Sequence, residues 1–343
     1  MVDDARARLS IPDSEFLEWR AKALNNKPTG QESTPDIVAV RELHEEAVRV
    51  ANEHRKTMLP SDSEYRVEHH TVPVENGFIT VRCIIPVSKD GAEGTFPVLV
   101  HFHGGGWIYG SIESDDVLLK YVSVSHRVSV VNVSYRLAPE HPYPTPNKDC
   151  YAAVKWAADN TTLLGADLKK GFIVSGLSAG GNAAAVIARW ARDDPFFKDR
   201  PLTGQIIQIP ALLSHYNVPE KYKAEVSACR EEFKDSEFLG LKDLNLIGMV
   251  YKPVKDDPNA WPLLHSEHSN LPPAALQVCG MDILRDDGLV YERELRAAGV
   301  KTQLFVYPGV PHWFEMISPN ITLARRWVDD YKKSVQWLLD GAV

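Results

Sequence analysis

The sequence predicts an α/β fold built on a mainly parallel, twisted sheet with helices on both faces. Beyond residue 97, continuous apolar runs bounded by turn residues alternate with segments of helical periodicity, which is the pattern of βαβ units. Before them, two alternating segments meet at Asn76-Gly77, the strongest short signal for a β-hairpin. The hairpin would supply an antiparallel edge and bring the predicted sheet to eight strands.

The elements follow in order along the chain. Phe16, Leu17 and Trp19 indicate a short first helix, and residues 34–58 predict a longer one that begins at Thr34 and Pro35. The apolar residues at near-helical spacing in this longer segment are Ile37, Val40, Leu43, Ala47, Val48 and Val50. The predicted strands are 64–74, 77–87, 97–103, 127–133, 171–175, 205–210, 274–279 and 302–307, and the helices between them are 115–126, 147–160, 179–193 and 287–298.

One interval, residues 211–271, breaks the alternation. A structureless loop of that length is unusual in a compact domain, so it is expected to contain helices of its own. We therefore predict N-terminal cap helices over residues 1–60 and a catalytic domain over 61–343, with a cap insertion at about 211–260. The two cap pieces would cover the carboxyl ends of the strands, where open α/β sheets bind their ligands.

Composition narrows the function classes. The chain has 343 residues and a formal charge of −8 without a basic cluster, which argues against nucleic acid as a partner. It has no apolar stretch long enough to span a bilayer, and acidic residues stand where a secretory signal would be basic. Four widely spaced cysteines suit buried free thiols in a reducing compartment, so a cytoplasmic protein is predicted. His265 and His268 lie in a polar loop without further ligands, and no metal site is expected.

Ser178 stands in Gly176-Leu177-Ser178-Ala179-Gly180, a G-x-S-x-G motif. The motif is weak alone, but here it follows a predicted strand and opens a predicted helix, as a nucleophile elbow must. A serine hydroxyl needs a base, and the base needs an orienting acid. In chain order the acid precedes the histidine. The sequence favours His312, after the last strand, as the base, and Asp282 as the acid over Asp286 and Asp287, because Asp286 adjoins Arg285 and Asp287 reads as a helix cap.

Three glycines, Gly104 to Gly106, follow His103 at the end of a predicted strand. Attack on an ester carbonyl creates an oxyanion, and glycine N–H groups can approach it because no side chain blocks them. We predict that Gly105, Gly106 and Ala179 donate to the oxyanion and that His103 braces the loop.

Taken together, these motifs resemble those of the hormone-sensitive-lipase-like group of α/β-hydrolases, esterases with an HGGG loop. The resemblance covers residues 97–314 and rests on "HFHGGGWIYGS", "VSYRLAPEHPYPTPNKDCYAAVKW", "GLSAGGNAA", "MDILRDDG" and "PGVPHWF". It implies an α/β-hydrolase fold with a helical cap, the triad Ser178, Asp282 and His312, and an oxyanion hole from Gly105, Gly106 and Ala179. It also implies that residues 135–142 buttress the HGGG loop.

The chain departs from the family pattern in three places. Leu177 stands where the family often has Asp or Thr, Trp313 where it usually has Gly, and residues 213–255 match weakly. The candidate substrate-binding residues are Trp107, Tyr109, Leu177, Tyr216 and Trp313, with Trp261 as a further aromatic.

The expected activity is that of a serine carboxylesterase acting on short-to-medium acyl esters or a small metabolite ester, with no cofactor and a possible homodimer. The same triad would serve an acyltransferase, lactonase or thioesterase. A non-catalytic small-molecule receptor is disfavoured, because receptors that resemble this family have lost the histidine that is present here as His312.

Overall fold

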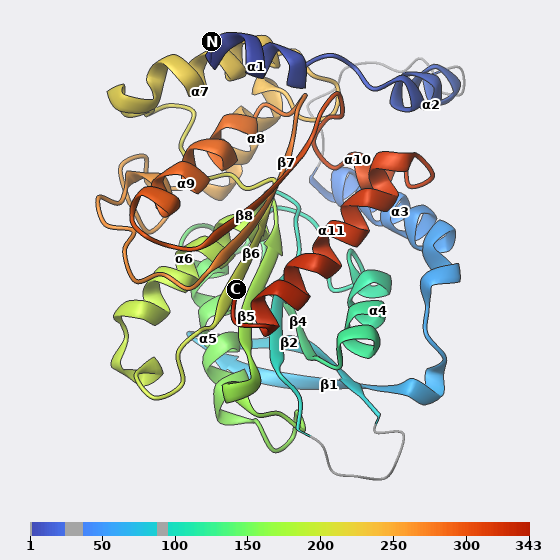
Figure 1. Cartoon of the computed structure of the whole chain (residues 1–343), viewed down its shortest axis with the longest axis vertical. Helices are drawn as coiled ribbons and strands as arrows, with labels where there is room; N and C mark the ends of the chain where they lie inside the picture. Colours follow the sequence, from blue (N-terminus) through green and yellow to red (C-terminus); the bar gives the residue numbers. More distant parts are fainter. Residues whose placement is uncertain (1, 25–36, 88–94) are drawn as a thin grey trace.

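A computed structural model describes residues 2–24, 37–87 and 95–343 (Figure 1). Its eight strands form one sheet in the order β1-β2-β4-β3-β5-β6-β7-β8. The pairs β1–β2 and β2–β4 are antiparallel, and all the pairs from β4 through β3 to β8 are parallel. This confirms the predicted α/β sheet. The strands are β1 (Tyr65–Val74), β2 (Gly77–Pro86), β3 (Val98–Phe102), β4 (Ser129–Ser134), β5 (Phe172–Leu177), β6 (Gly204–Gln208), β7 (Ala274–Cys279) and β8 (Thr302–Tyr307).

The predicted hairpin is present, with its turn one residue earlier than expected. Val74 pairs with Gly77, so Glu75 and Asn76 form the turn. Asn76 takes the positive φ of 59° that this residue type tolerates.

Helices cover both faces of the parallel strands. On one face α4 and α11 pack on side chains such as Leu99 and Ile173, and on the other α5, α6 and α9 pack on side chains such as Val100 and Val174 (Figure 1). The two sets alternate along each strand because successive side chains point to opposite faces. The α-helices are α1 (Val2–Leu9), α2 (Ser14–Leu24), α3 (Ile37–Arg55), α4 (Asp116–His126), α5 (Thr145–Asp159), α6 (Ala179–Asp193), α7 (Glu220–Glu232), α8 (Leu241–Tyr251), α9 (Arg285–Ala297), α10 (Phe314–Ile317) and α11 (Thr322–Leu339).

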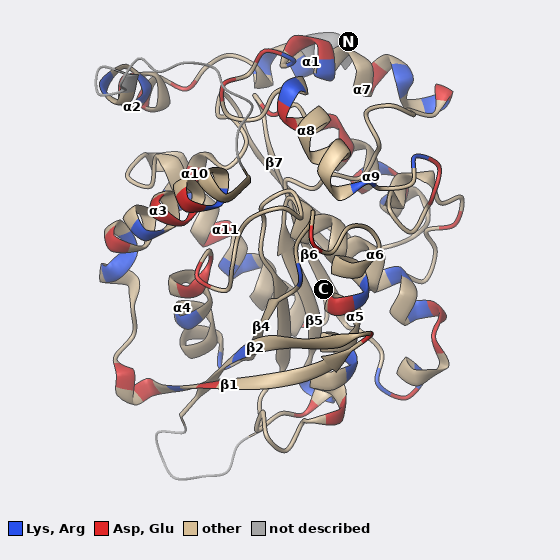
Figure 2. Cartoon of the chain, turned by 180° about the vertical axis from the view of Figure 1, so that it is seen from behind, with Lys and Arg blue, Asp and Glu red and all other residues tan. Residues whose placement is uncertain are grey.

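Charged side chains lie mainly on the outer helices and loops, with acidic and basic residues interspersed, whereas the central strands carry almost none (Figure 2). The four cysteines are buried free thiols, as expected. Among the described residues, no helix has the length and apolar character required to cross a membrane.

The long helix α3 packs through most of the apolar residues at helical spacing, together with an arginine that the spacing did not include. Its buried residues are Val48, Ala51 and Arg55, whereas Leu43 is 72% exposed and Val50 is also exposed. The predicted start at Thr34 and Pro35 lies outside the described residues. Ile37, Val40 and Ala47 are half-buried, so the apolar spacing predicted the helix and most of its packed face, and only Leu43 and Val50 of the six apolar residues lie outside that face.

Helices α7 and α8 occupy the interval that broke the alternation, which confirms that it contains helices. Together with α3, α8 borders a cavity at the carboxyl ends of the strands.

Candidate functional site

Ser178 lies on a sharp turn between β5 and α6. Its φ of 56° and ψ of −111° are strained for a residue with a side chain. The turn needs glycine on either side, because a Cβ at Gly176 would lie 2.1 Å from the carbonyl oxygen of Gly180, and one at Gly180 would lie 2.0 Å from that of Phe102. The result is a hydroxyl that lines the cavity above the sheet.

The structure brings the three predicted triad side chains together. His312 Nε2 lies 3.0 Å from Ser178 Oγ, and His312 Nδ1 lies 2.6 Å from Asp282 Oδ2. The second carboxylate oxygen of Asp282 accepts the backbone N–H of Leu284 at 2.9 Å. These bonds fix the direction of both the carboxylate and the imidazole.

The two other candidate acids, Asp286 and Asp287, bind partners other than His312. Asp286 pairs with Arg285 at 3.2 Å. Asp287 was expected to cap α9, and this is wrong: the helix begins at Arg285, and the buried Asp287 carboxylate instead accepts the N–H groups of Leu212 and Leu213 and pairs with Arg230. Asp287 lies on α9, so its carboxylate joins the segment after β6 to this helix by accepting these two N–H groups.

The glycine loop faces the same cavity as Ser178. Gly105 and Gly106 have φ values of 116° and 57°, which favour glycine. Within the described part of the chain, neither N–H has a hydrogen-bond acceptor. Both are therefore free to donate to a ligand. Ala179 follows Ser178 directly, at the start of α6.

His103 braces this loop, as predicted. Its Nδ1 lies 2.7 Å from the carbonyl oxygen of Gly104, and its ring stacks on Tyr135 with centroids 4.2 Å apart. The Tyr135 hydroxyl donates to the carbonyl oxygen of His103 at 2.8 Å, which agrees with a buttressing role for residues 135–142. Burial lowers the pKa of His103 to about 4, so the ring is neutral at physiological pH.

All five candidate substrate-binding residues, and Trp261, border the cavity. Tyr216 is half exposed at 52%, whereas Trp107 is buried and stacks on Tyr251 with centroids 4.3 Å apart. Trp313 adopts a left-handed conformation with φ 63°, which explains why glycine suits this position in the family. The wall of the cavity is thus largely aromatic and aliphatic.

His44 is a cavity residue that the sequence analysis missed. It projects from α3, and its ring stacks on Trp313 with centroids 4.8 Å apart and contacts Tyr109 at 4.7 Å. Burial lowers the pKa of His44 to about 4. The positions four and seven residues further on, Val48 and Ala51, are buried on the same helix face, and this helical spacing is the signal that would have identified His44.

His265 and His268 do not meet. His265 Nδ1 accepts the N–H of Glu267, and His268 packs edge-on against Tyr291. The described residues contain no cluster of three or more side chains suited to a metal ion.

Just beyond His312, Glu315 is fully buried beside Arg55, which donates to the carbonyl oxygen of Glu315 at 2.8 Å. Burial raises the pKa of Glu315 from 4.5 to about 7. The folded state therefore binds this proton more tightly than the unfolded chain. The resulting stabilisation is complete below about pH 4.5 and is lost as the pH rises through 7.

Glu315→Gln, which stays neutral, is expected to remove this pH dependence. Between pH 5 and pH 8 the free energy of unfolding of the wild type should fall by on the order of 2 kcal/mol more than that of the variant. Urea unfolding at the two pH values measures the difference. Equal changes in both proteins would contradict the assignment.

Comparison with known proteins agrees with this geometry. A family model described as the alpha/beta hydrolase fold matches residues 99–316. The chain is 34% identical over 339 residues to an AB hydrolase superfamily protein of Schizosaccharomyces pombe, covering 97% of each. It is 35% identical over 250 residues to the versiconal hemiacetal acetate esterase of Dothistroma septosporum, covering 73% of this chain and 75% of that protein.

Among solved structures, the crystal structure of vibralactone cyclase superposes with a TM-score of 0.92 at 38% identity, covering 97% of this chain and 96% of that one. The chain belongs to the α/β-hydrolase family, in the hormone-sensitive-lipase-like group that its motifs resemble.

Proposed function

We propose that this protein is a serine carboxylesterase with Ser178 as nucleophile, His312 as general base and acid, and Asp282 as the orienting carboxylate. One observation carries the proposal: a continuous chain of short hydrogen bonds runs from Asp282 through His312 to a strained, cavity-facing Ser178. The likeness to the versiconal hemiacetal acetate esterase supports ester hydrolysis as the reaction class.

The proposed reaction has two steps. His312 Nε2 takes the proton of Ser178 as Oγ attacks the ester carbonyl, and the N–H groups of Gly105, Gly106 and Ala179 stabilise the oxyanion. The imidazolium returns the proton to the departing alcohol and leaves an acyl group on Ser178. Water, deprotonated by the same nitrogen, then releases the acid. Asp282 holds Nδ1–H throughout, so Nε2 is the nitrogen that is free to accept a proton.

The apolar lining of the cavity favours an apolar ester. Its lining includes Leu239, Leu244, Ile247 and the indole of Trp107 around Ser178. Burial of apolar surface contributes about 25 cal/mol per Å², so an acyl chain or ring seated there gains affinity in proportion to the area it buries. Short-to-medium acyl groups are the proposed substrates.

A panel of p-nitrophenyl esters from acetate to palmitate, assayed with the wild type and Ser178→Ala, tests the proposal. The wild type is expected to prefer the shorter esters, and Ser178→Ala to lose about 10⁴-fold or more in kcat while remaining folded by circular dichroism. A folded Ser178→Ala protein that keeps its esterase rate would refute the proposed nucleophile.

A second candidate function is acyl transfer to a hydroxyl group of the substrate itself, which closes a lactone instead of releasing an acid. The likeness to vibralactone cyclase at a TM-score of 0.92 favours it. The acyl-enzyme is the same, and the two outcomes differ only in the oxygen that attacks it. Mass analysis of products from hydroxy-acyl esters in ¹⁸O water separates them: hydrolysis places ¹⁸O in the product acid, whereas cyclisation yields unlabelled lactone.

A further inference from the structure

Backbone from the N-terminal segment, residues 6–13, lies directly against the two loops that carry Asp282 and His312. The N–H of Gly309 donates to the carbonyl oxygen of Leu9 at 2.8 Å, and the N–H of Asp13 donates to that of Gly309 at 3.0 Å. A Cβ at Gly280 would lie 2.2 Å from the same Leu9 oxygen. Only glycine at this position permits such a close approach.

The two loops are also joined to each other next to this segment. The N–H of Gly280 donates to the carbonyl oxygen of Tyr307 at 2.8 Å, and the N–H of Met281 donates to that of Val310 at 2.9 Å. Met281 directly precedes Asp282, and Val310 is two residues before His312. The backbone of residues 9–13 therefore packs where the two loops are hydrogen-bonded to each other, within a few residues of Asp282 and His312.

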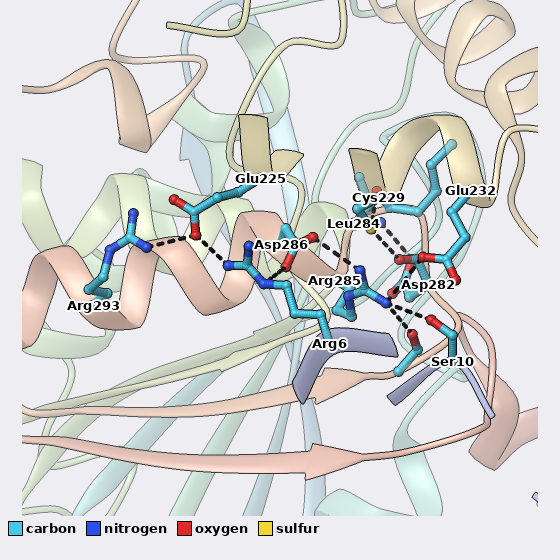
Figure 3. Close-up of polar contacts among 12 residues, drawn as sticks. Arg6, Ser10, Glu225, Cys229, Glu232, Asp282, Leu284, Arg285, Asp286 and Arg293 are labelled. Carbon is cyan, nitrogen blue, oxygen red and sulfur yellow. Dashed lines mark hydrogen bonds and ion pairs between the residues drawn. The ribbon is translucent and has the colours of Figure 1, made fainter. Parts of the chain in front are cut away.

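The side chain of Arg285 connects the N-terminal segment to the loop that carries Asp282 (Figure 3). It is 3% exposed, and its Nη1 donates to Ser10 Oγ and to the carbonyl oxygen of Gly280, both at 3.0 Å. Cys229 Sγ on α7 adds a contact of 3.3 Å to the carbonyl oxygen of Asp282. A planar guanidinium with several donors can hold these partners in one geometry.

Arg6 makes the second side-chain connection (Figure 3). Its Nε pairs with Asp286 Oδ1 at 3.1 Å, and its Nη2 pairs with Glu225 on α7. Arg293 on α9 pairs with the same carboxylate oxygen of Glu225 at 2.8 Å but makes no contact with residues 6–13 that the described structure records. Arg6 thus links the N-terminal segment to α7 and α9, whereas Arg293 links only those two helices.

We propose that residues 6–13 act as a positioning element for the catalytic loops, with Arg285 as the positioning residue through which they act. The inference rests on the proposed roles of Asp282 and His312. The segment would hold the Asp282 carboxylate and the His312 imidazole in the correct relative position. Loss of its contacts would therefore slow the chemical step rather than weaken substrate binding. Misplacement by about 1 Å can cost on the order of 100-fold in rate.

The test removes the side-chain contacts that join the segment to the rest of the full-length protein. Arg6→Ala combined with Ser10→Ala removes both connections and leaves the loops intact. The matched control, Lys221→Ala combined with Arg293→Ala, removes two ion pairs between α7 and α9, Lys221–Glu294 and Arg293–Glu225, and leaves Arg6 paired with Glu225 and Asp286. The Arg6/Ser10 variant loses three contacts, two of which involve the buried Asp286 and Arg285, whereas the control loses contacts of more exposed side chains. The thermal stability of both variants is therefore measured, and labelling is compared at a temperature at which both are folded.

The readout is the rate of covalent labelling by diethyl p-nitrophenyl phosphate, together with kcat and KM for p-nitrophenyl butyrate. Labelling joins Ser178 Oγ to phosphorus and expels p-nitrophenolate, and it needs an activated serine but little of the cavity. We expect the Arg6/Ser10 variant to label about fivefold more slowly, with kcat lowered in parallel and KM within twofold of the wild type. The control variant should label at the wild-type rate.

A labelling rate equal to that of the wild type, an equal loss in the control, or a rise in KM alone would overturn the proposal. Arg285→Lys and Arg285→Met supply a second series at the buried residue: lysine, which keeps a donor, is expected to label faster than methionine. Equal rates for the two would also count against it. Failure here is distinct from failure of the proposed function, because that failure would leave the wild type itself unlabelled and inactive.

Discussion

Asp282→Asn is expected to lower kcat about 10⁴-fold while the chain stays folded. The amide oxygen can still accept the N–H of Leu284, which now bonds one carboxylate oxygen at 2.9 Å. This orientation turns the amide NH₂ toward His312 Nδ1, which lies 2.6 Å from the other carboxylate oxygen. Nδ1 must then accept a hydrogen bond, so the proton moves to Nε2 and the ring can no longer take one from Ser178.

Steady-state hydrolysis of p-nitrophenyl butyrate measures this effect, with Asp287→Asn as the matched control. Asp287 is also buried, but it binds Leu212, Leu213 and Arg230 rather than the imidazole. Its replacement is expected to lower the Tm and to leave kcat within a few-fold of the wild type. A large loss of kcat in Asp287→Asn and none in Asp282→Asn would reverse the assignment of the acid.

Gly105→Ala should reduce kcat/KM by on the order of 10²- to 10³-fold, equivalent to about 3–4 kcal/mol of lost oxyanion stabilisation. Gly105 has a φ of 116°, and a Cβ there would lie 2.1 Å from the carbonyl oxygen of Tyr109. The loop must therefore move, and the N–H groups of Gly105 and Gly106 move with it.

Gly299→Ala separates this effect from backbone strain alone. Gly299 also has a positive φ, 82°, but a Cβ there would meet nothing within 4 Å. We expect it to cost about 1 kcal/mol of stability and nothing in kcat/KM. If Gly105→Ala kept wild-type activity, or if both variants lost activity equally, the glycine loop would not be the oxyanion site.

Most of the sheet and the positions of the proposed triad residues were predictable because their signals are local. A buried parallel strand is a continuous apolar run, as in 274–279, and the turn at Ser178 needs small neighbours that are visible in the sequence. His312 and Asp282 could be chosen because each follows a strand end, and parallel strands bring those ends to one edge.

The parts that were missed depend on contacts between distant residues. Helix α3 buries Arg55 and exposes Leu43, because Arg55 finds acceptors on α10, and no feature of the α3 sequence reveals those partners. Asp287 was predicted to be a helix cap because its true partners, Arg230 and the backbone after β6, lie far from it in the sequence. The network around Arg285 joins positions 6, 10, 225 and 286, a set with no common spacing along the chain.

The central claim, that Ser178 is activated by His312 to form a covalent intermediate, is tested most directly by mass spectrometry after treatment with diethyl p-nitrophenyl phosphate. We predict one diethylphosphoryl group per chain, located on Ser178, with no adduct in Ser178→Ala and labelling slowed by at least 100-fold in His312→Gln. An adduct on another residue, or labelling of His312→Gln at the wild-type rate, would contradict it.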